Sequence, residues 1–391
     1  MTMTLKHNFD EIVDRRGTNS SKWLKYPADV LPMWIADSDF RCAQPIVDEM
    51  KRLAEHGVYG YPYVQEGSFE RATVRWCHVR YDWDFEESMV DFVPSTGTAL
   101  AVAVKAFCEP GDKVLMQTPI YPPFTAVTQK NGCTASNNPL IFRDGKWEID
   151  FEDFERRAAD PKCKLFLLCN PHNPTGKVFT AEELTKIADI CGRHGVVVFA
   201  DEVHSDFVHA PNRHQVFAKL SEAAKNMCVT AVNPAKTFNI AGLRTSSVVT
   251  MNPELQARYQ AALASCKLGR EGFGIAGYVK AFTECDYYAD QLLPYIQGNL
   301  HYVLDYIHEH FPQIGAYMPE GTFFLWLDCR KLPFKTQAEL DRFFVEKVKL
   351  GLNPGDTFGV EGERFLRMNV ACPRAYCEEA MRRMSAAFAE L

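Results

Sequence analysis

The sequence predicts an α/β protein built on a mostly parallel β-sheet. Short apolar runs recur through the middle of the chain and are continuous rather than alternating, which is typical of strands covered on both faces. A helix is predicted after Thr180, which forms a capping box with Glu183, and it ends near Gly195, just before the next strand. Such alternation indicates parallel pairing with helices on both faces of the sheet. The predicted strands are residues 113–116, 164–169, 196–199, 227–230 and 246–250.

The chain of 391 residues is long enough for two domains, at roughly 100–200 residues each. The central alternation indicates a large α/β domain over residues 45–290. The two ends differ from it. Residues 1–44 hold turns and the run LPMWIADSDF, and the C-terminal part holds PEGTFFLWLD, a predicted strand, between amphipathic helices. We therefore expect a smaller domain formed by residues 1–44 together with residues 291–391.

The composition is that of an ordinary globular enzyme, with 47% hydrophobic and 24% charged residues. The formal net charge of −7 argues against nucleic acid and anionic membranes as partners. The 13 cysteines are scattered without a CxxC pair, which fits reduced thiols. No apolar run approaches the ~20 residues that span a bilayer, and the first residues lack the apolar core of a signal peptide. We expect a soluble, cytoplasmic protein that binds neither nucleic acid nor membrane.

Residues that follow the predicted strands carry most of the chemistry, because ligands of open α/β sheets bind beyond the carboxyl ends of the strands. The segment PSTGT at residues 94–98 precedes an apolar helix. Its glycine, flanked by hydroxyl residues at a helix N-terminus, forms a cup whose free N–H groups attract an anion, with a simple helix cap as the structural alternative. Tyr121, held between prolines in TPIYPPF, offers a flat face to a planar ring, or is a core tyrosine.

The next two strand ends carry an amide and a carboxylate. NPHNPTG at residues 170–176 is a rigid turn that presents Asn173 as a donor for one fixed hydrogen bond, although such turns are common for structural reasons alone. Asp201 leaves the middle of an apolar sheet, where a carboxylate is costly unless it is paired. Asp201 is either a buried cap or ion pair, or the partner of a cationic ring nitrogen.

Lys236 follows the apolar run CVTAV and precedes the small residues Ala241 and Gly242. Most single lysines are simply solvated. Here, however, an amine, an anion cup, a stacking ring, an amide donor and a buried carboxylate all follow strands of one sheet, and this is the set that pyridoxal phosphate requires. We therefore expect pyridoxal 5′-phosphate as the cofactor, with Lys236, Asp201 and Tyr121 as catalytic residues.

The chain resembles the fold-type I pyridoxal-phosphate enzymes of the aspartate aminotransferase superfamily, from about Phe9 to the C-terminus. Within that superfamily it is similar to the MalY/PatB group of carbon–sulfur β-lyases, which includes cystathionine β-lyases and cystalysin. The resemblance implies a large domain with a seven-stranded, mostly parallel sheet between helices, and a smaller α/β domain. The segments that carry it are LPMWIADSDF (31–40), GYPYVQEG (60–67), TPIYPPF (118–124), NPHNPTGKV (170–178), DEVHSD (201–206) and AKTFNIAGLR (235–244).

The resemblance also implies roles for residues at the cofactor. Lys236 would hold the cofactor covalently and move the Cα proton. Asp201 would keep the ring nitrogen protonated, and Tyr121 would stack on the ring. Further cofactor contacts are implied for Gly97, Thr98, Asn173, His204, Asn233, Arg244 and, from the neighbouring subunit of a homodimer with shared active sites, Tyr61.

The substrate side is implied in the same way. Arg367, in the segment RMNVA, matches the arginine that grips the substrate α-carboxylate, and its planar fork suits bidentate binding. Ala36 and Asp37 would line the substrate entrance.

Two positions depart from the pattern of the relatives. Ala235 replaces the serine that usually precedes the lysine, so one hydroxyl for the phosphate is missing, and Asn233 or Arg244 is expected to compensate. His204 stands where classical aminotransferases have a tyrosine near the ring O3′. A histidine at this position is usual in the lyase group and favours a lyase.

The expected function is a C–S β-lyase that cleaves L-cystathionine, related cysteine S-conjugates or cysteine to a thiol, pyruvate and ammonia by α,β-elimination. The alternative is a class I/II aminotransferase that transfers an amino group to a 2-oxo acid with the same residues. A metal hydrolase built on His204 and His209 lacks an HExxH motif, so no metal is expected. A cofactor-binding regulator without activity is hinted at only by Ala235.

Overall fold

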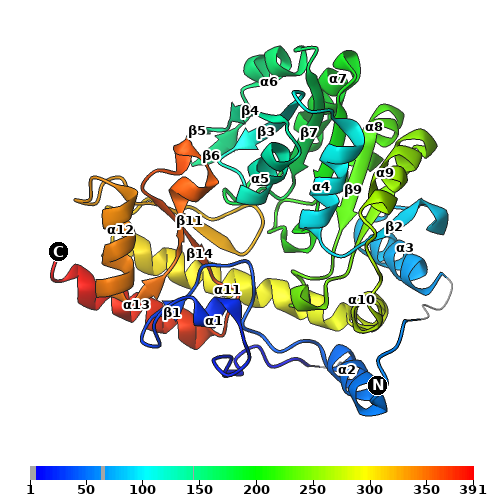
Figure 1. Cartoon of the computed structure of the whole chain (residues 1–391). Coiled ribbons are helices and arrows are strands. Elements are labelled where there is room, and N and C mark those ends of the chain that lie inside the picture. The colour runs from blue at the N-terminus through cyan, green and yellow to red at the C-terminus, as the bar shows by residue number, and fades with distance from the viewer. Residues whose placement is uncertain (1–5, 63–66, 144) are drawn as a thin grey trace.

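The computed structural model describes residues 6–62, 67–143 and 145–391. Its main sheet has seven strands, in the order β2-β10-β9-β8-β7-β3-β4, with helices packed on both faces (Figure 1). Neighbouring strands pair in parallel except for β10, which is antiparallel to both of its neighbours. The prediction of a mostly parallel seven-stranded sheet is therefore confirmed. Its strands are β2 (Val90–Val93), β3 (Lys113–Thr118), β4 (Thr134–Pro139), β7 (Cys163–Cys169), β8 (Val197–Asp201), β9 (Cys228–Val232) and β10 (Ser246–Thr250).

The central strands are apolar throughout because both of their faces are buried. Side chains of a strand alternate between the two faces. In β7, Leu165 and Leu167 belong to one core, and Phe166 and Leu168 belong to the other. The first core is completed by α4 (Thr96–Phe107), α5 (Pro122–Lys130) and α9 (Pro253–Ser265), and the second by α6 (Phe151–Ala158), α7 (Ala181–His194) and α8 (Glu222–Met227).

The helix predicted after Thr180 is α7. The hydroxyl of Thr180 accepts from the backbone N–H of Glu183 at 3.2 Å, and the Glu183 carboxylate accepts from the backbone N–H of Thr180 at 2.9 Å. Gly195, with φ 66°, ends the helix in the left-handed conformation that glycine adopts without strain. Strand β4 was not predicted, because its sequence TASNNP is polar, as is common at a sheet edge.

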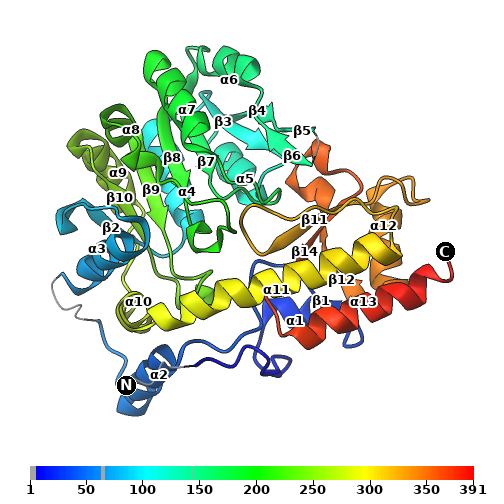
Figure 2. The same cartoon turned by 180° about the vertical axis from the view of Figure 1, so that it is seen from behind.

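A second, antiparallel sheet lies beside the main sheet, in the order β11-β14-β13. The strand predicted in PEGTFFLWLD is β11 (Phe324–Asp328). The N-terminal β1 (Leu31–Pro32) pairs in parallel with β12 (Leu350–Gly351), so the N-terminal and C-terminal parts of the chain pack together (Figure 2). Helix α11 (Asp286–His310) runs through the expected boundary at residue 290, and the division into two domains stays a prediction.

The remaining elements cover these two sheets (Figures 1 and 2). Among the described residues, no helix combines the length and apolar character that crossing a membrane requires. These elements are α1 (Ser21–Leu24), α2 (Gln44–His56), α3 (Ser68–Tyr81), β5 (Ile141–Arg143), β6 (Lys146–Glu148), α10 (Gly272–Glu284), α12 (Gln337–Phe343) and α13 (Arg374–Phe388). The two strands that complete the second sheet with β11 are β13 (Asn353–Pro354) and β14 (Phe365–Asn369).

Thr180→Ala is expected to lower the free energy of unfolding by about 1 kcal/mol, because the N–H of Glu183 loses its acceptor at the start of α7. Urea unfolding followed by circular dichroism measures the change. Thr180→Ser, which keeps the hydroxyl, serves as the control. Equal stability of the alanine and serine variants would contradict a stabilising role of this cap.

Candidate active site

A cavity of about 230 Å³ lies at the carboxyl ends of the strands of the main sheet. This is the place that the sequence predicts for a ligand site. The predicted site residues in its wall are Ala36, Gly97, Tyr121, Asn173, Asp201, His204, Asn233 and Lys236, and the wall also contains Pro94, Ser95, Thr96, Cys169, Val203, Ala235, Ala241 and Thr245.

Lys236 enters this cavity from the turn that follows β9. Its Nζ donates a hydrogen bond to the carbonyl oxygen of Ala36 at 2.8 Å. Burial lowers the pKa of the amine, and the carboxylate of Asp37 opposes that shift. A lysine with a lowered pKa exchanges protons at neutral pH more readily than a solvated one, so Lys236 suits a general base.

The N-terminus of α4 lies in the segment 94–98 that the sequence indicates as an anion cup. Ser95 is the N-cap, and its hydroxyl accepts from the backbone N–H of Thr98 at 3.2 Å. The hydroxyls of Thr98 and Ser95 lie 3.0 Å apart, and Thr98 is not in the cavity wall. Ser95, Thr96 and Gly97 face the cavity instead, where the positive end of the helix favours an anion. The preference of serine for N-caps is the signal that places the cup correctly.

Asn233 connects this cup to the turn that carries Lys236. Its Nδ2 donates to the hydroxyl of Thr96 at 3.1 Å, and its Oδ1 accepts from the backbone N–H of Ala235 at 2.8 Å. Arg244, which the sequence offers as the other substitute for the missing serine hydroxyl, is exposed, with φ 49°, and lies outside the cavity wall. Of these two residues, Asn233 is the one that reaches the cup.

Asp201 and His204 are both buried at the end of β8, with hydrogen-bonding capacity left unused. Among the described residues, the carboxylate of Asp201 accepts only a 3.3 Å bond from the backbone N–H of Val203. Burial raises the pKa of Asp201 to about 7, although the N–H of Val203 and the charge of Lys236 lower it. Burial lowers the pKa of His204 far below its usual value, and its Nδ1 has no hydrogen-bond partner in the part of the chain that the structure describes. A ligand with a cationic nitrogen and a polar oxygen would meet both needs.

Arg367 is a buried guanidinium without a carboxylate partner. It lies 4.0 Å from the ring centre of Phe324, and burial lowers its pKa to about 9. Its Nη1 donates to Oδ1 of Asn173 at 2.7 Å, and its Nη2 donates to the Trp34 carbonyl at 2.9 Å and to Oδ1 of Asn353 at 2.7 Å. Its Nε has no partner. A buried cation that is held only by neutral acceptors is suited to a carboxylate ligand.

Of the remaining predicted residues, Tyr121 lines the cavity, whereas Asp37 and Tyr61 do not. Asp37 directly follows Ala36, and its carboxylate forms an ion pair with Arg15 at 2.6 Å, so it lies beside the cavity wall. Tyr61 is fully exposed and does not line the cavity. Part of the GYPYVQEG segment, residues 63–66, lies outside the described residues. Tyr121 follows β3 in the wall, and burial raises its pKa.

His204 and His209, considered above for a metal site, and the nearby His214 each contact a different partner. Nε2 of His209 lies 2.7 Å from the carbonyl oxygen of Thr322. Nε2 of His214 lies 2.9 Å from a carboxylate oxygen of Glu202, and both of these side chains are buried. His204 packs against Phe323 and Phe324.

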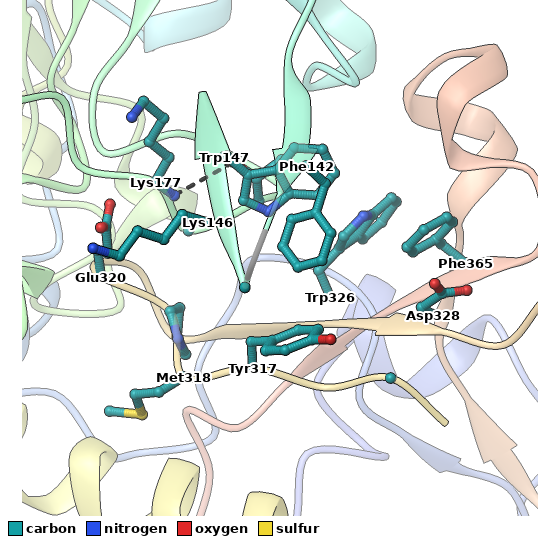
Figure 3. Close-up of a pocket in the computed structure, with 15 residues that line it drawn as sticks. Phe142, Lys146, Trp147, Lys177, Tyr317, Met318, Glu320, Trp326, Asp328 and Phe365 are labelled. Carbon is teal, nitrogen blue, oxygen red and sulfur yellow. Dashed lines mark hydrogen bonds between the residues drawn. The ribbon is translucent and has the colours of Figure 1, made fainter. Parts of the chain in front are cut away.

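A second, smaller cleft lies between the β5–β6 hairpin and the β11-β14-β13 sheet (Figure 3). Its walls are aromatic, with Phe142 and Trp147 on the hairpin and Trp326 and Phe365 on the sheet. None of the predicted site residues lines it. Trp326 pairs with Arg367 in the register of β11 and β14, so this cleft adjoins the strand that carries the carboxylate-binding arginine. Burial shifts the pKa values of Lys236, Asp201 and His204, which all line the first cavity, and we place the active site there.

Comparison with known proteins agrees with this geometry. The family model described as "Aminotransferase class I and II" matches residues 33–384. Cystathionine beta-lyase PatB of Bacillus subtilis is 37% identical, over 97% of this chain and 99% of PatB. Protein MalY of Escherichia coli is 31% identical, over 96% of this chain and 97% of MalY. The crystal structure of cystalysin from Treponema denticola, which contains pyridoxal 5′-phosphate, superimposes with a TM-score of 0.94 at 27% identity and covers 99% of this chain and all of that one.

The chain therefore belongs to the class I and II aminotransferase family, whose members are pyridoxal-phosphate enzymes with the type I fold. Within that family it belongs to the group of C–S lyases that includes PatB and MalY. Its cofactor is pyridoxal 5′-phosphate.

The residues of the cavity fit this cofactor. The unpaired carboxylate of Asp201 suits a pyridine nitrogen that carries a proton, and the unpartnered Nδ1 of His204 suits a ring oxygen. The open N-terminus of α4 with Ser95 and Thr96 suits the phosphate. Lys236 supplies the amine in the same cavity.

In the cofactor-free protein, Asp201→Asn is expected to flatten the fall of stability with rising pH. The folded pKa of Asp201 is about 7, above the value of about 4 in an unfolded chain, so folding must take up a proton once the pH exceeds 4. Stability is then highest at acidic pH and is lost as the pH rises through 7. Urea unfolding at pH 5 and pH 8 should show the wild type losing roughly 2 kcal/mol more than the variant. Identical losses would contradict a protonated Asp201 in the empty site.

Proposed function

We propose that this enzyme is a C–S β-lyase that cleaves L-cystathionine, related cysteine S-conjugates or cysteine to a thiol, pyruvate and ammonia. The observation that carries the proposal is the joint placement of Lys236 and Asp201 in one cavity, with the guanidinium of Arg367 bonded to Asn173 in its wall. Relatives named as cystathionine β-lyase support the choice of reaction.

Arg367 binds the α-carboxylate of the amino acid in this proposal. Phe324 and Phe358 hold its guanidinium from two sides, with ring centres at 4.0 and 5.0 Å, and Asn173 fixes its Nη1. Its hydrogen bonds are to neutral oxygens, so an arriving carboxylate meets an uncompensated cation. This fixed grip orients the Cα–H bond of the substrate toward Lys236, and orientation of this kind is a large part of catalysis.

Lys236 then removes the Cα proton with its Nζ, which burial keeps ready to lose and regain a proton. Pyridoxal phosphate, when bound, supplies an electron sink for the carbanion at Cα. Asp201 would hold the cofactor at its ring nitrogen and stabilise a positive charge there, Tyr121 would stack on the ring, and His204 and Asn173 would bond its ring hydroxyl. The thiolate leaves from Cβ of the substrate, and the three-carbon fragment is hydrolysed to pyruvate and ammonia.

The active enzyme in this proposal is a homodimer with shared active sites. Val58, Tyr59 and Tyr61 expose 72%, 66% and 105% of their surface, which is unusual for three large apolar or aromatic side chains so close in sequence. Packing against a second copy would cover them. Tyr61 would then reach the cofactor phosphate of the neighbouring subunit.

Purified enzyme loaded with cofactor is expected to release pyruvate from L-cystathionine with no keto acid added. The release should continue over many turnovers, because β-elimination regenerates the enzyme without a second substrate. Coupling to lactate dehydrogenase measures the pyruvate, and Lys236→Ala is the blank. If the wild type converts amino acids only when a 2-oxo acid is supplied, the enzyme is an aminotransferase and the lyase proposal fails.

A further inference from the structure

One wall of the active-site cavity is a short turn at residues 35–37, and Ala36 at its centre lines the cavity. The backbone N–H of Asp37 donates to the carbonyl of Ile35 at 2.8 Å, which closes a three-residue γ-turn. The carbonyl of Ala36 accepts from Nζ of Lys236 at 2.8 Å. The turn therefore presents one backbone oxygen to the amine that acts as the base in the proposed function.

The buried side chain of Asn369 clamps both ends of this turn. Its Nδ2 donates to the carbonyl of Ile35 at 2.7 Å and to the carbonyl of Asp37 at 3.0 Å. Its Oδ1 accepts from the backbone N–H of Ala371 at 2.8 Å, and its own backbone N–H donates to the carbonyl of Met33 at 2.8 Å. Because Asn369 is fully buried, loss of its side-chain amide would leave buried polar groups of the turn unpaired.

Asn369 ends β14, the strand that carries Arg367. The two residues are two positions apart, so their side chains point to the same face of the sheet. Arg367 donates to the carbonyl of Trp34, just before the turn. It is also held by Asn173 and Asn353. Loss of the clamp would therefore loosen the acceptor of the amine more than it loosens the guanidinium that binds the substrate carboxylate in the proposed function.

Lys236 needs a fixed acceptor because its amine is free for part of each turnover in the proposed function. The substrate displaces this amine from the cofactor, and the amine then moves the Cα proton. A lysine side chain is long and flexible, with roughly 2 kcal/mol of rotamer entropy. A general base acts only within hydrogen-bond reach of its proton. The carbonyl of Ala36, on which Nζ rests, limits the positions that the amine can take.

We propose that Asn369 is a positioning residue for proton transfer by Lys236. It fixes the turn so that the carbonyl of Ala36 returns the free amine to one place in the cavity. This role depends on Lys236 being the base, as in the proposed function. Asn369 performs it without lining the cavity itself.

Exchange of the Cα proton of L-alanine with D₂O tests this role, because L-alanine has no leaving group at Cβ and only proton transfer is measured. Proton NMR follows the exchange by enzyme loaded with cofactor. Asn369→Leu, which keeps the size but removes the donor, is expected to lower kcat about 10-fold, as a misplaced base does. KM should change by less than about 3-fold, since Arg367 keeps its two other acceptors.

Asn299→Leu is the matched control. Asn299, on α11, is equally buried, and its Nδ2 also donates to two backbone carbonyls, those of Val370 at 3.0 Å and Cys372 at 2.8 Å. Both carbonyls lie beyond the end of β14, and neither belongs to the turn. The control loses a similar pair of hydrogen bonds, yet it should leave kcat of the exchange unchanged.

The cofactor-free protein gives a second measurement that needs no turnover. Acetic anhydride acetylates neutral amines, and mass spectrometry compares Lys236 with the other lysines of the same protein. An amine whose proton is held by an acceptor stays charged, so release from the carbonyl of Ala36 increases the neutral fraction. Asn369→Leu is expected to raise the acetylation of Lys236 at pH 7 about 5-fold, whereas Asn299→Leu should match the wild type.

Asn369→Ser serves if the leucine variant does not fold. Its single hydroxyl can donate to only one of the two carbonyls, so it should give a smaller fall in kcat and a smaller rise in acetylation.

The role of Asn369 is contradicted if its variants change kcat and the acetylation of Lys236 no more than Asn299→Leu does. It is equally contradicted if KM rises while kcat stays constant, because Asn369 then acts through Arg367. A wild type that exchanges no Cα proton contradicts Lys236 as the base and this role with it. Protein whose exchange depends on Asn369 but that releases no pyruvate from L-cystathionine contradicts the lyase and keeps the role of Asn369.

Discussion

Lys236 and Asp201 line one cavity, Arg367 is bonded to Asn173 in its wall, and none of these three ionisable side chains forms an ion pair with another. This arrangement is the constraint on which the rest of the structure depends. Buried charges without partners are costly, and the cost is visible in the raised pKa of Asp201 and the lowered pKa values of Lys236 and Arg367. The main sheet, buried on both faces, is the rigid support that keeps these groups in place. The opposite charges that they lack are those of the ligands they are arranged to bind.

The N-terminal segment gives the second part of this arrangement. It passes from β1, which pairs with β12 of the C-terminal part, to the wall of the cavity formed by the main sheet. There its carbonyl groups neutralise part of the charge of Lys236 and Arg367 without adding an anion. A carboxylate in their place would compete with the substrate. Neutral acceptors hold both cations in position and leave their charge available, which explains why backbone oxygens serve here.

The sequence could predict the parts of the site that follow apolar strands. Lys236, Asp201, Asn173 and Tyr121 each follow such a strand, and strand ends of one parallel sheet meet at one edge. Gly97 of the expected anion cup also lines the cavity, whereas Thr98 does not, because a glycine between hydroxyls gives the motif but not the position of the N-cap, which is Ser95.

Contacts between distant segments of the chain could not be predicted in this way. Arg244 lies only eight residues from Lys236 but is exposed, whereas Asn233 reaches Thr96 across 137 residues. Arg15 has no motif of its own. It forms an ion pair with Asp37 because hydrogen bonds of Lys22, Asp39 and Asn369 hold the N-terminal segment in place. These contacts join separate parts of the chain, so the local sequence does not predict them. Strand β4 was not predicted because its own sequence is polar. It lies at the edge of the main sheet and pairs with β3.

The central claim is that Lys236 carries the cofactor in the cavity at the strand ends. Reduction of the cofactor-loaded protein with borohydride, followed by digestion and mass spectrometry, tests it most directly because reduction makes the link between lysine and cofactor permanent. The account predicts one modified peptide, containing residues 235–244, with the pyridoxyl group on Lys236. A label on another lysine, or a coloured protein that carries none, would contradict the account.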